Sequence, residues 1–290
     1  MRATLAAFAA GCAVLSVAPM SAFAQAPAYS PARTADGHPD LGGVWSNAEA
    51  KVTLSRTING KVQTSILNEP DDVLPFKDRK SAIAWRGKYR NYVTGGPQPD
   101  FTLGVDTLPY RDRCLMAANA AAPPMTSQGY NDAYQIVQTP SVMVISVEMM
   151  DETRIVRMVA GAAEAAKAHG PQVLQRWTGD SVGWWEGDTL VVETVNVNAG
   201  QGRQSPFPTS KDAVAVERFT RTGERELFYQ AEVTDPAIYT GPWKIEYSFH
   251  PTLRLWEYAC HEGNYGLAAI LSGVRKTERD ALKSKRQRKP

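Results

Sequence analysis

The ten consecutive residues from Trp256 to Tyr265 place several reactive side chains close together. They include a thiol, an imidazole, two carboxylates, an amide and two phenols, and they follow a run that alternates apolar and polar residues. An imidazole titrates near neutral pH, a neighbouring carboxylate can hold its tautomer, and a tyrosine can donate or accept a proton. The stretch therefore predicts a site for acid–base chemistry at the end of a strand.

Each side chain in this stretch has an expected role in catalysis. We expect His261 to be the acid or base and Glu262 or Glu148 its partner, while Asn264 stabilises an oxyanion and Tyr265 positions the substrate. The alternative is a plain cap of a strand, with the Asn and Gly in its turn. The residues expected to bind the substrate are Arg113, Glu148, Trp185, Trp243 and Tyr258.

The cysteines predict a disulfide. Removal of an N-terminal export signal takes away Cys12 and leaves Cys114 and Cys260, which we expect to pair in an oxidising compartment. Closing so long a loop stabilises the folded chain by about 4–5 kcal/mol on chain-entropy arguments. The bridge would also bring Arg113, a candidate anion ligand, to the reactive stretch. The alternative is a nucleophilic Cys260, which requires a free thiolate.

The N-terminus has the pattern of a secretory signal. Arg2 precedes an apolar run over 3–18, and Ala22-Phe-Ala24 provides the cleavage site, so residues 1–24 are expected to be removed. A lipoprotein signal ending at Cys12 is the alternative. No later run reaches the roughly 20 apolar residues of a membrane span. We therefore expect a soluble protein exported to a bacterial periplasm, with no transmembrane segment.

Composition limits the class of protein. The chain has 290 residues, of which 43% are hydrophobic and 21% charged, with a net charge of +2. These values suit globular domains with a core, and the low net charge does not favour nucleic acid as a partner. We expect an extended leader over 25–40, one barrel domain over 41–281, and a basic disordered tail over 282–290, for which an interaction patch is the alternative.

Most of the chain after Tyr130 alternates in the period of β-strands, with turn residues between the runs. The even succession of hairpins predicts a mostly β protein, an antiparallel up-and-down barrel. A peripheral helix is expected near 76–92, a short one over 160–168 and a closing helix over 267–283. The expected strands begin with Trp45 and then cover 134–138, 142–148, 154–158, the hairpin 182–194, 214–221, 226–233, 243–249 and 253–259.

Two other chemistries are considered and disfavoured. Gly179–Gly183 matches a nucleophile elbow, with Asp235 and His261 following in hydrolase order, but the motif lies at a β-hairpin rather than a strand-to-helix turn. No two histidines stand at metal-ligand spacing, and only a set from different strands (His261, Glu148 and His250) would remain. No phosphate-binding glycine loop is present. We therefore expect no metal and no cofactor.

Several motifs are spread over most of the mature chain: Pro39–Trp45, Arg113–Leu115, Gln135–Pro140, Gly179–Thr194, Glu217–Thr220, Asp235-Pro236, Gly241–Trp243 and Glu257–Tyr265. Together they resemble a family of exported bacterial proteins of largely uncharacterised function. That family usually has a short Asp-Gly-Arg turn after the strand of Arg154, where this chain has residues 160–168. The Gly43-Val-Trp45 start also resembles calycin (lipocalin-type) barrels, which are mostly binders with a few cyclases and isomerases.

These features lead to one main hypothesis and two alternatives. The main hypothesis is a periplasmic, cofactor-independent lyase, isomerase or hydrolase that acts on a small organic, aromatic or glycosidic substrate in a barrel pocket. The first alternative is a lipocalin-like carrier of a small hydrophobic or aromatic ligand, without catalysis. The second is an envelope interaction protein that uses the basic tail.

Overall fold

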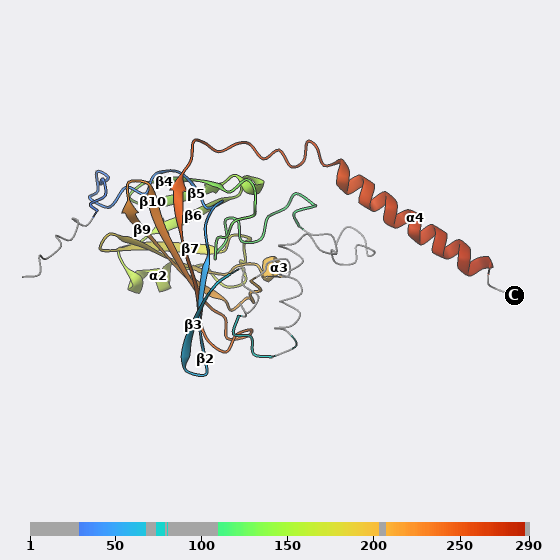
Figure 1. The fold of residues 1–290 in the computed structure, drawn as a ribbon, viewed down its shortest axis with the longest axis horizontal. Coiled ribbons are helices and arrows are strands. Elements are labelled where there is room, and N and C mark those ends of the chain that lie inside the picture. The colour runs from blue at the N-terminus through green and yellow to red at the C-terminus, as the bar shows by residue number, and fades with distance from the viewer. Residues whose placement is uncertain (1–28, 68–73, 79, 81–109, 203–206, 288–290) are drawn as a thin grey trace, which may run out of the picture.

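The structure is a computed structural model that describes residues 29–67, 74–78, 80, 110–202 and 207–287 (Figure 1). The expected export signal lies outside the described residues. The same holds for most of the helix expected near 76–92 and for the last three residues of the chain.

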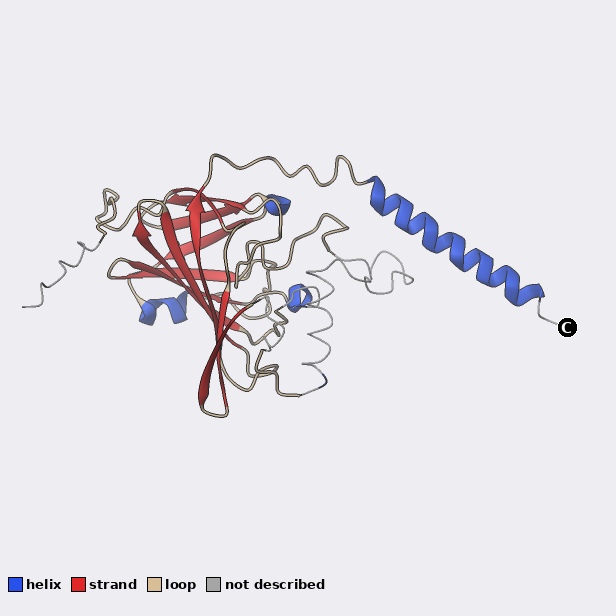
Figure 2. Ribbon diagram, in the orientation of Figure 1, coloured by secondary structure: helices blue, strands red, loops and turns tan. Residues whose placement is uncertain are grey.

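The described part of the chain folds around a closed barrel of nine strands (Figures 1 and 2). Each strand pairs with the next one in the order β1, β4 to β11, and β1 then pairs with β11 to close the ring. The predicted mostly β barrel is thus confirmed. The barrel strands are β1 (Gly43–Ser46), β4 (Ala133–Gln138), β5 (Val142–Val147), β6 (Thr153–Met158), β7 (Asp180–Glu186), β8 (Thr189–Val195), β9 (Val214–Gly223), β10 (Glu226–Thr234) and β11 (Trp243–Pro251).

A hairpin that the sequence analysis did not identify extends from the barrel. It consists of β2 (Thr53–Ile58) and β3 (Lys61–Ile66), joined at Asn59 and Gly60. Both turn residues have positive φ angles, of 51° and 73°, as a two-residue hairpin turn requires. β2 pairs with the first half of β11, whereas β1 pairs with its last two residues. The length of β11 therefore lets one strand serve both the ring and the hairpin.

One pair of barrel strands departs from the antiparallel pattern that we expected throughout. β6 and β7 are parallel, with Val156 opposite Ser181. Because the two strands are parallel, the chain between them returns from one end of the barrel to the other, and this connection includes helix α2 (Ala162–Ala168). Ala165 of α2 packs on Val182 and Val191, on the outer face of β7 and β8.

The strand expected over 253–259 does not form, and this prediction was wrong. Residues 252–264 run along the rim of the barrel without regular structure, and we call them the strap. The side chain of Leu253 in the strap is 97% exposed. After the strap comes α4 (Tyr265–Gln287), the predicted closing helix, which continues beyond its expected end at Lys283. The described residues also form a 3-10 turn, η2 (Met149–Asp151), and a short helix, α3 (Ala199–Gly202).

The inside of the barrel is filled by side chains and by a segment of the chain itself. Residues 116–128, which we call the plug, pack with inward-facing residues of the strands in one hydrophobic core. Three strand tyrosines hold the plug by its backbone. Tyr229 accepts the Met125 N–H at 3.0 Å, Tyr247 donates to the Met125 carbonyl at 2.7 Å, and Tyr134 donates to the Ala120 carbonyl at 3.3 Å. Because the plug and the inward-facing side chains fill the lumen, the place where a ligand could bind is the rim of the barrel.

No helix in the described ranges combines the length and the apolar composition needed to cross a bilayer.

Candidate functional site

A disulfide between Cys114 and Cys260 fixes the strap to the barrel. Its Cα atoms are 5.7 Å apart and its cysteines are separated by 146 positions in the sequence. The predicted bridge is confirmed, and Cys260 is not a free nucleophile. The disulfide holds the strap against the loop that leads into the plug, so that two segments from distant parts of the chain form one surface.

Three hydrogen bonds place the rest of the strap. Glu148, at the end of β5, accepts the Trp256 N–H at 3.2 Å, and Asp151 accepts the Tyr258 N–H at 3.3 Å. Asn264 donates through Nδ2 to the Asp112 carbonyl at 2.9 Å. Glu148 is buried and also accepts a hydrogen bond from Asn131 at 2.5 Å. In the structure, this predicted substrate ligand therefore anchors the strap.

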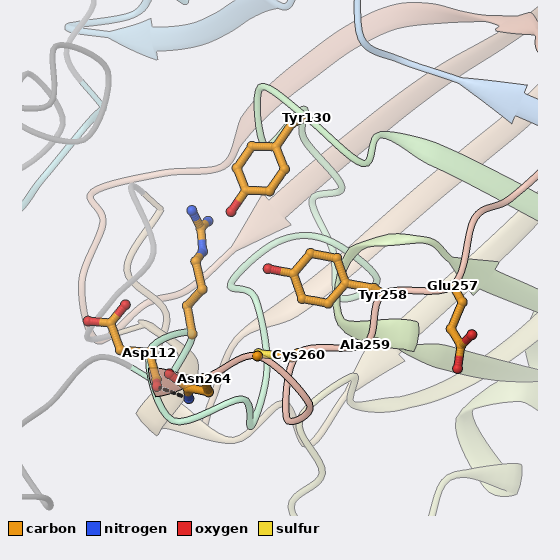
Figure 3. A pocket seen from close by; sticks show the side chains of 9 residues that line it. Asp112, Tyr130, Glu257, Tyr258, Ala259, Cys260 and Asn264 are labelled. Carbon is orange, nitrogen blue, oxygen red and sulfur yellow. Dashed lines mark hydrogen bonds between the residues drawn. The ribbon is translucent and has the colours of Figure 1, made fainter. Parts of the chain in front are cut away.

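An open hollow of about 470 Å³ lies between the strap and the loops before and after the plug (Figure 3). Its lining combines a guanidinium, two phenols, two carboxylates and backbone from the strap. The lining residues are Arg111, Asp112, Tyr130, Glu257, Tyr258, Ala259, Cys260, Gly263 and Asn264. The reactive stretch and the loop before Cys114 thus do meet, as the disulfide predicted.

Two phenols form the polar centre of the hollow. Figure 3 shows the hydroxyls of Tyr130 and Tyr258 directed toward the same region. Burial, together with the hydrogen bond and the charge of Tyr130, raises the pKa of Tyr258 to about 12, and the nearby Arg111 opposes this rise. At neutral pH, Tyr258 is therefore a hydroxyl that can both donate and accept a hydrogen bond.

A charged pair of neighbours forms one side of the hollow. Arg111 donates through Nη2 to Oε1 of the buried Gln128 at 2.7 Å, which holds its guanidinium in place. Partial burial raises the pKa of the Asp112 carboxyl, and the charge of Arg111 lowers it in part.

The four predicted catalytic residues are separated by the structure. Asn264 lines the hollow, and its Oδ1 also accepts the Leu267 N–H at 3.2 Å, so it caps the N-terminus of α4. His261 and Glu262 are exposed on the strap beside the hollow but do not line it. Tyr265 is 82% exposed as the first residue of α4.

The other predicted substrate ligands lie in different places. Tyr258 lines the hollow. Trp243 is fully buried in the barrel core, where its ring stacks on Phe207 at 5.3 Å. Trp185 stacks on His38 at 4.7 Å, and the Arg113 guanidinium lies 5.8 Å from the Tyr110 ring. Neither Trp185 nor Arg113 lines the hollow.

Sequence reasoning missed Arg111, Asp112 and Tyr130. The predicted disulfide could have pointed to these residues, because it brings the whole segment around Cys114 to the strap. We chose Arg113 because it is adjacent to the cysteine, but Cys114 has a positive φ of 52°. From this segment, the hollow is lined by Asp112 and Arg111, which stand two and three positions before the cysteine.

Glu152 is a second titratable group that the sequence did not indicate. Its Oε1 accepts the Ala117 N–H of the plug at 2.7 Å, while Oε2 is buried without a partner among the described residues. Burial raises the pKa of Glu152 to about 7, against the opposing effect of the Ala117 and Ala121 amides. This carboxyl supports the plug rather than facing the hollow.

The elbow-like motif is structural. Ser181 is buried in β7, where it accepts a hydrogen bond from Arg154 Nε at 2.9 Å and lies 2.9 Å from the Thr194 hydroxyl. In the part of the chain that the structure describes, no cluster of three or more His, Cys, Asp or Glu side chains is arranged to hold a metal ion.

No family model, curated protein or solved structure matches this chain. The resemblance to a family of exported bacterial proteins stays a prediction from the motifs.

Proposed function

We propose that this chain is an exported binding protein for a small organic anion and that the ligand occupies the hollow at the barrel rim. The observation that carries the proposal is the presence of Arg111, Tyr130 and Tyr258 together in one hollow of about 470 Å³. That volume falls in the usual range for small-molecule sites.

The charges and hydroxyls of the hollow indicate the chemistry of the ligand. The Arg111 guanidinium, held by Gln128, places a positive charge in the lining of the hollow, which favours an anionic ligand such as a carboxylate. The two phenols offer ring faces for an aromatic or other apolar part and hydroxyls for a polar group. Figure 3 shows Asp112 and Glu257 at opposite sides of the hollow, where they can accept hydrogen bonds from ligand hydroxyl or amino groups. The ligand class is a hydroxylated or amino-substituted aromatic acid.

Export to a periplasm is part of the same proposal. The N-terminal residues have the pattern of a cleaved signal, and the Cys114–Cys260 bridge is typical of proteins in oxidising compartments.

Acid–base catalysis in the hollow is the second candidate function. The position of the Asp112 carboxyl in the lining of the hollow, next to Arg111, favours it, because a carboxyl in a ligand site can take or give a proton. His261 is the acid or base predicted from the sequence, with Glu262 as its partner, but both lie beside the hollow, so Asp112 is the acid or base that its lining offers. The reaction class would be that of a lyase, isomerase or hydrolase without a cofactor.

One experiment tests both candidates. The purified protein is incubated with cell extract, and metabolites are profiled for retention on the protein and for depletion from the mixture. We expect an aromatic acid to be retained, with roughly tenfold weaker retention by Arg111→Gln or Tyr258→Phe, since each removes a ligand contact. Arg113→Gln is the matched control, because it removes a neighbouring guanidinium that does not line the hollow. Equal losses in the Arg111 and Arg113 variants would refute the binding site.

Catalysis is recognised by depletion with a new product. In that case Asp112→Asn and His261→Ala are compared, and the residue that acts as acid or base shows the larger loss of turnover. Full turnover in both variants rules out the catalytic roles given to them.

A further inference from the structure

Helix α4 extends away from the barrel (Figure 1). Within the described residues, the side-chain interactions found along it are internal. Lys276 pairs with Asp280 at 2.6 Å, and the hydroxyls of Thr277 and Ser284 donate to carbonyls one turn earlier. Its link to the rest of the molecule is the strap and the cap at Asn264. A helix of 23 residues in this position presents its sides to whatever surrounds the protein.

The two halves of α4 differ in composition. Leu267, Ile270, Leu271 and Val274 follow the spacing i, i+3, i+4 and i+7, so they form an apolar stripe over the first half. Beyond Val274 the helix is basic. Six Lys or Arg residues and two acidic residues give α4 a net charge of +4, although the whole chain carries only +2.

Four of these basic residues lie on one side of the helix. At 100° per residue, Arg275, Lys276, Arg279 and Lys283 share a face that borders the apolar stripe. A short apolar stripe beside a face rich in Lys and Arg is typical of helices that lie in the interface of an anionic membrane. We propose that α4 binds the surface of a membrane that contains anionic phospholipid, with Leu267 to Val274 in the headgroup region and the basic face against the lipid phosphates.

A second copy of the chain fits α4 less well. A stable coiled coil needs an apolar seam over three or four heptads, and here Glu278 follows the stripe after two turns. Two such helices side by side would also bring their net positive charges together. An anionic surface, by contrast, compensates that charge and covers the short stripe.

The strap adds apolar surface next to α4. Leu253 is 97% exposed and Trp256 is 59% exposed, although both are residues that are usually buried. Tryptophan is enriched at membrane–water interfaces, where its ring lies at the level of the headgroups. These two side chains therefore extend the surface that would face the lipid. The rim hollow then lies next to the membrane, but the proposal does not depend on a ligand there.

The test is co-sedimentation of the mature, disulfide-bonded protein with vesicles. We expect at least roughly tenfold stronger partition onto vesicles with about 30 mol % phosphatidylserine than onto pure phosphatidylcholine, and a steep loss in high salt. Arg279→Gln/Lys283→Gln is expected to lower the partition about tenfold, and Leu271→Ser to lower it several-fold. The matched control is Lys51→Gln/Lys61→Gln, which removes the same charge from exposed positions near the β2–β3 hairpin and should bind as the parent does.

Three results would overturn the proposal. The first is equal partition onto both kinds of vesicle, and the second is an equal loss in the control variant. The third is a dimer in sedimentation equilibrium that Leu271→Ser converts to a monomer, because α4 would then be covered by a second copy. Helix content measured by circular dichroism shows whether a variant retains α4.

Discussion

Arg154 of β6 and Glu217 of β9 form an ion pair inside the barrel, where their side chains are 1% and 0% exposed. Arg154 Nη1 lies 3.0 Å from Glu217 Oε1, and the same guanidinium donates to the hydroxyls of Ser181 and Thr194. Tyr229 also donates to Glu217, at 2.8 Å. The pair thus joins strands that are not neighbours in the sheet and satisfies a charge that the core could not otherwise hold.

Removal of one partner of this pair should be severely destabilising. We expect Glu217→Ala to lower the free energy of unfolding by about 3–5 kcal/mol, because it leaves the Arg154 guanidinium charged and unpaired in the core. Arg154→Met/Glu217→Leu should lose less, since no buried charge remains. Urea unfolding followed by tryptophan fluorescence measures both.

The exposed pair Arg218–Glu186, at 2.7 Å, is the control for this prediction. We expect Arg218→Ala to change the free energy of unfolding by less than about 1 kcal/mol. A loss in Glu217→Ala as small as that of the control would contradict the importance of the buried pair.

The disulfide should stabilise the fold and order the strap. Since it links residues 146 positions apart, we expect Cys114→Ser/Cys260→Ser to lower the free energy of unfolding by roughly 2–5 kcal/mol. Amide hydrogen exchange should rise in residues 110–115 and 256–264 and stay unchanged in β9 and β10. Reductant should reproduce these effects in the parent and leave the double variant unchanged. Unaltered exchange in the strap would show that its hydrogen bonds alone suffice.

Stability should fall as pH rises from about 4.5 to 7 because of Glu152. Its pKa is about 7 in the folded chain against an ordinary value of 4.5, so the folded state keeps a proton that the unfolded state loses. The stabilisation is complete below 4.5 and is lost as pH rises through 7, for a total of about 3 kcal/mol. Denaturation across this range should show a smaller decline in Glu152→Gln. The exposed Glu164→Gln is the control, and an equal change in both variants would refute the assignment.

The pKa of Tyr258 should depend on Tyr130. Because the hydrogen bond between them favours the neutral phenol, we expect Tyr130→Phe to lower the pKa of Tyr258 from about 12 toward 10. Nuclear magnetic resonance of ring-labelled tyrosine follows this titration, and the signal lost in Tyr258→Phe identifies the residue. Tyr265→Phe, at an exposed position outside the hollow, should leave the titration unchanged. An unshifted pKa in Tyr130→Phe would mean that burial alone causes the rise.

The sequence predicted the barrel strands because most of them alternate clearly between buried and exposed positions. In β11, for example, Trp243, Ile245 and Tyr247 are buried and the residues between them are not. β3 was missed because its residues are mostly exposed, so that alternation carries no signal there. The Asn59-Gly60 turn was the clearest mark of this hairpin, because the buried positions of β2 are occupied by Leu54 and the polar Arg56.

The false strand over 253–259 has a physical explanation. Its residues alternate, but a strand also needs a free edge, and β10, β2 and β1 already occupy the edges of β11. An alternating pattern of apolar and polar residues describes one segment only. It does not show whether a neighbouring strand still has a free edge to pair with that segment. The parallel β6–β7 pair was missed for a similar reason, because the crossover through α2 is a property of the whole barrel.

The position of the site was predicted from the sequence, but most of the residues that line it were not. Cysteine count and expected compartment were sufficient for the disulfide, and the disulfide was sufficient to bring the loop before Cys114 to the strap. Which side chains of that loop enter the hollow depends on its local backbone conformation, which spacing in the sequence does not reveal. In the structure Arg111 lines the hollow and Arg113 does not.

The seam of the barrel affects when the protein can fold. Trp45 and Ser46 of β1 pair with Pro251 and His250 of β11, so closure joins residues about 200 positions apart, and contacts this distant form slowly. A chain whose last strand has not yet been synthesised can pair β1 with β4 but lacks the second partner of β1, so the ring stays open. The ring therefore cannot close until β11 is available, which delays completion of the barrel to the end of chain synthesis.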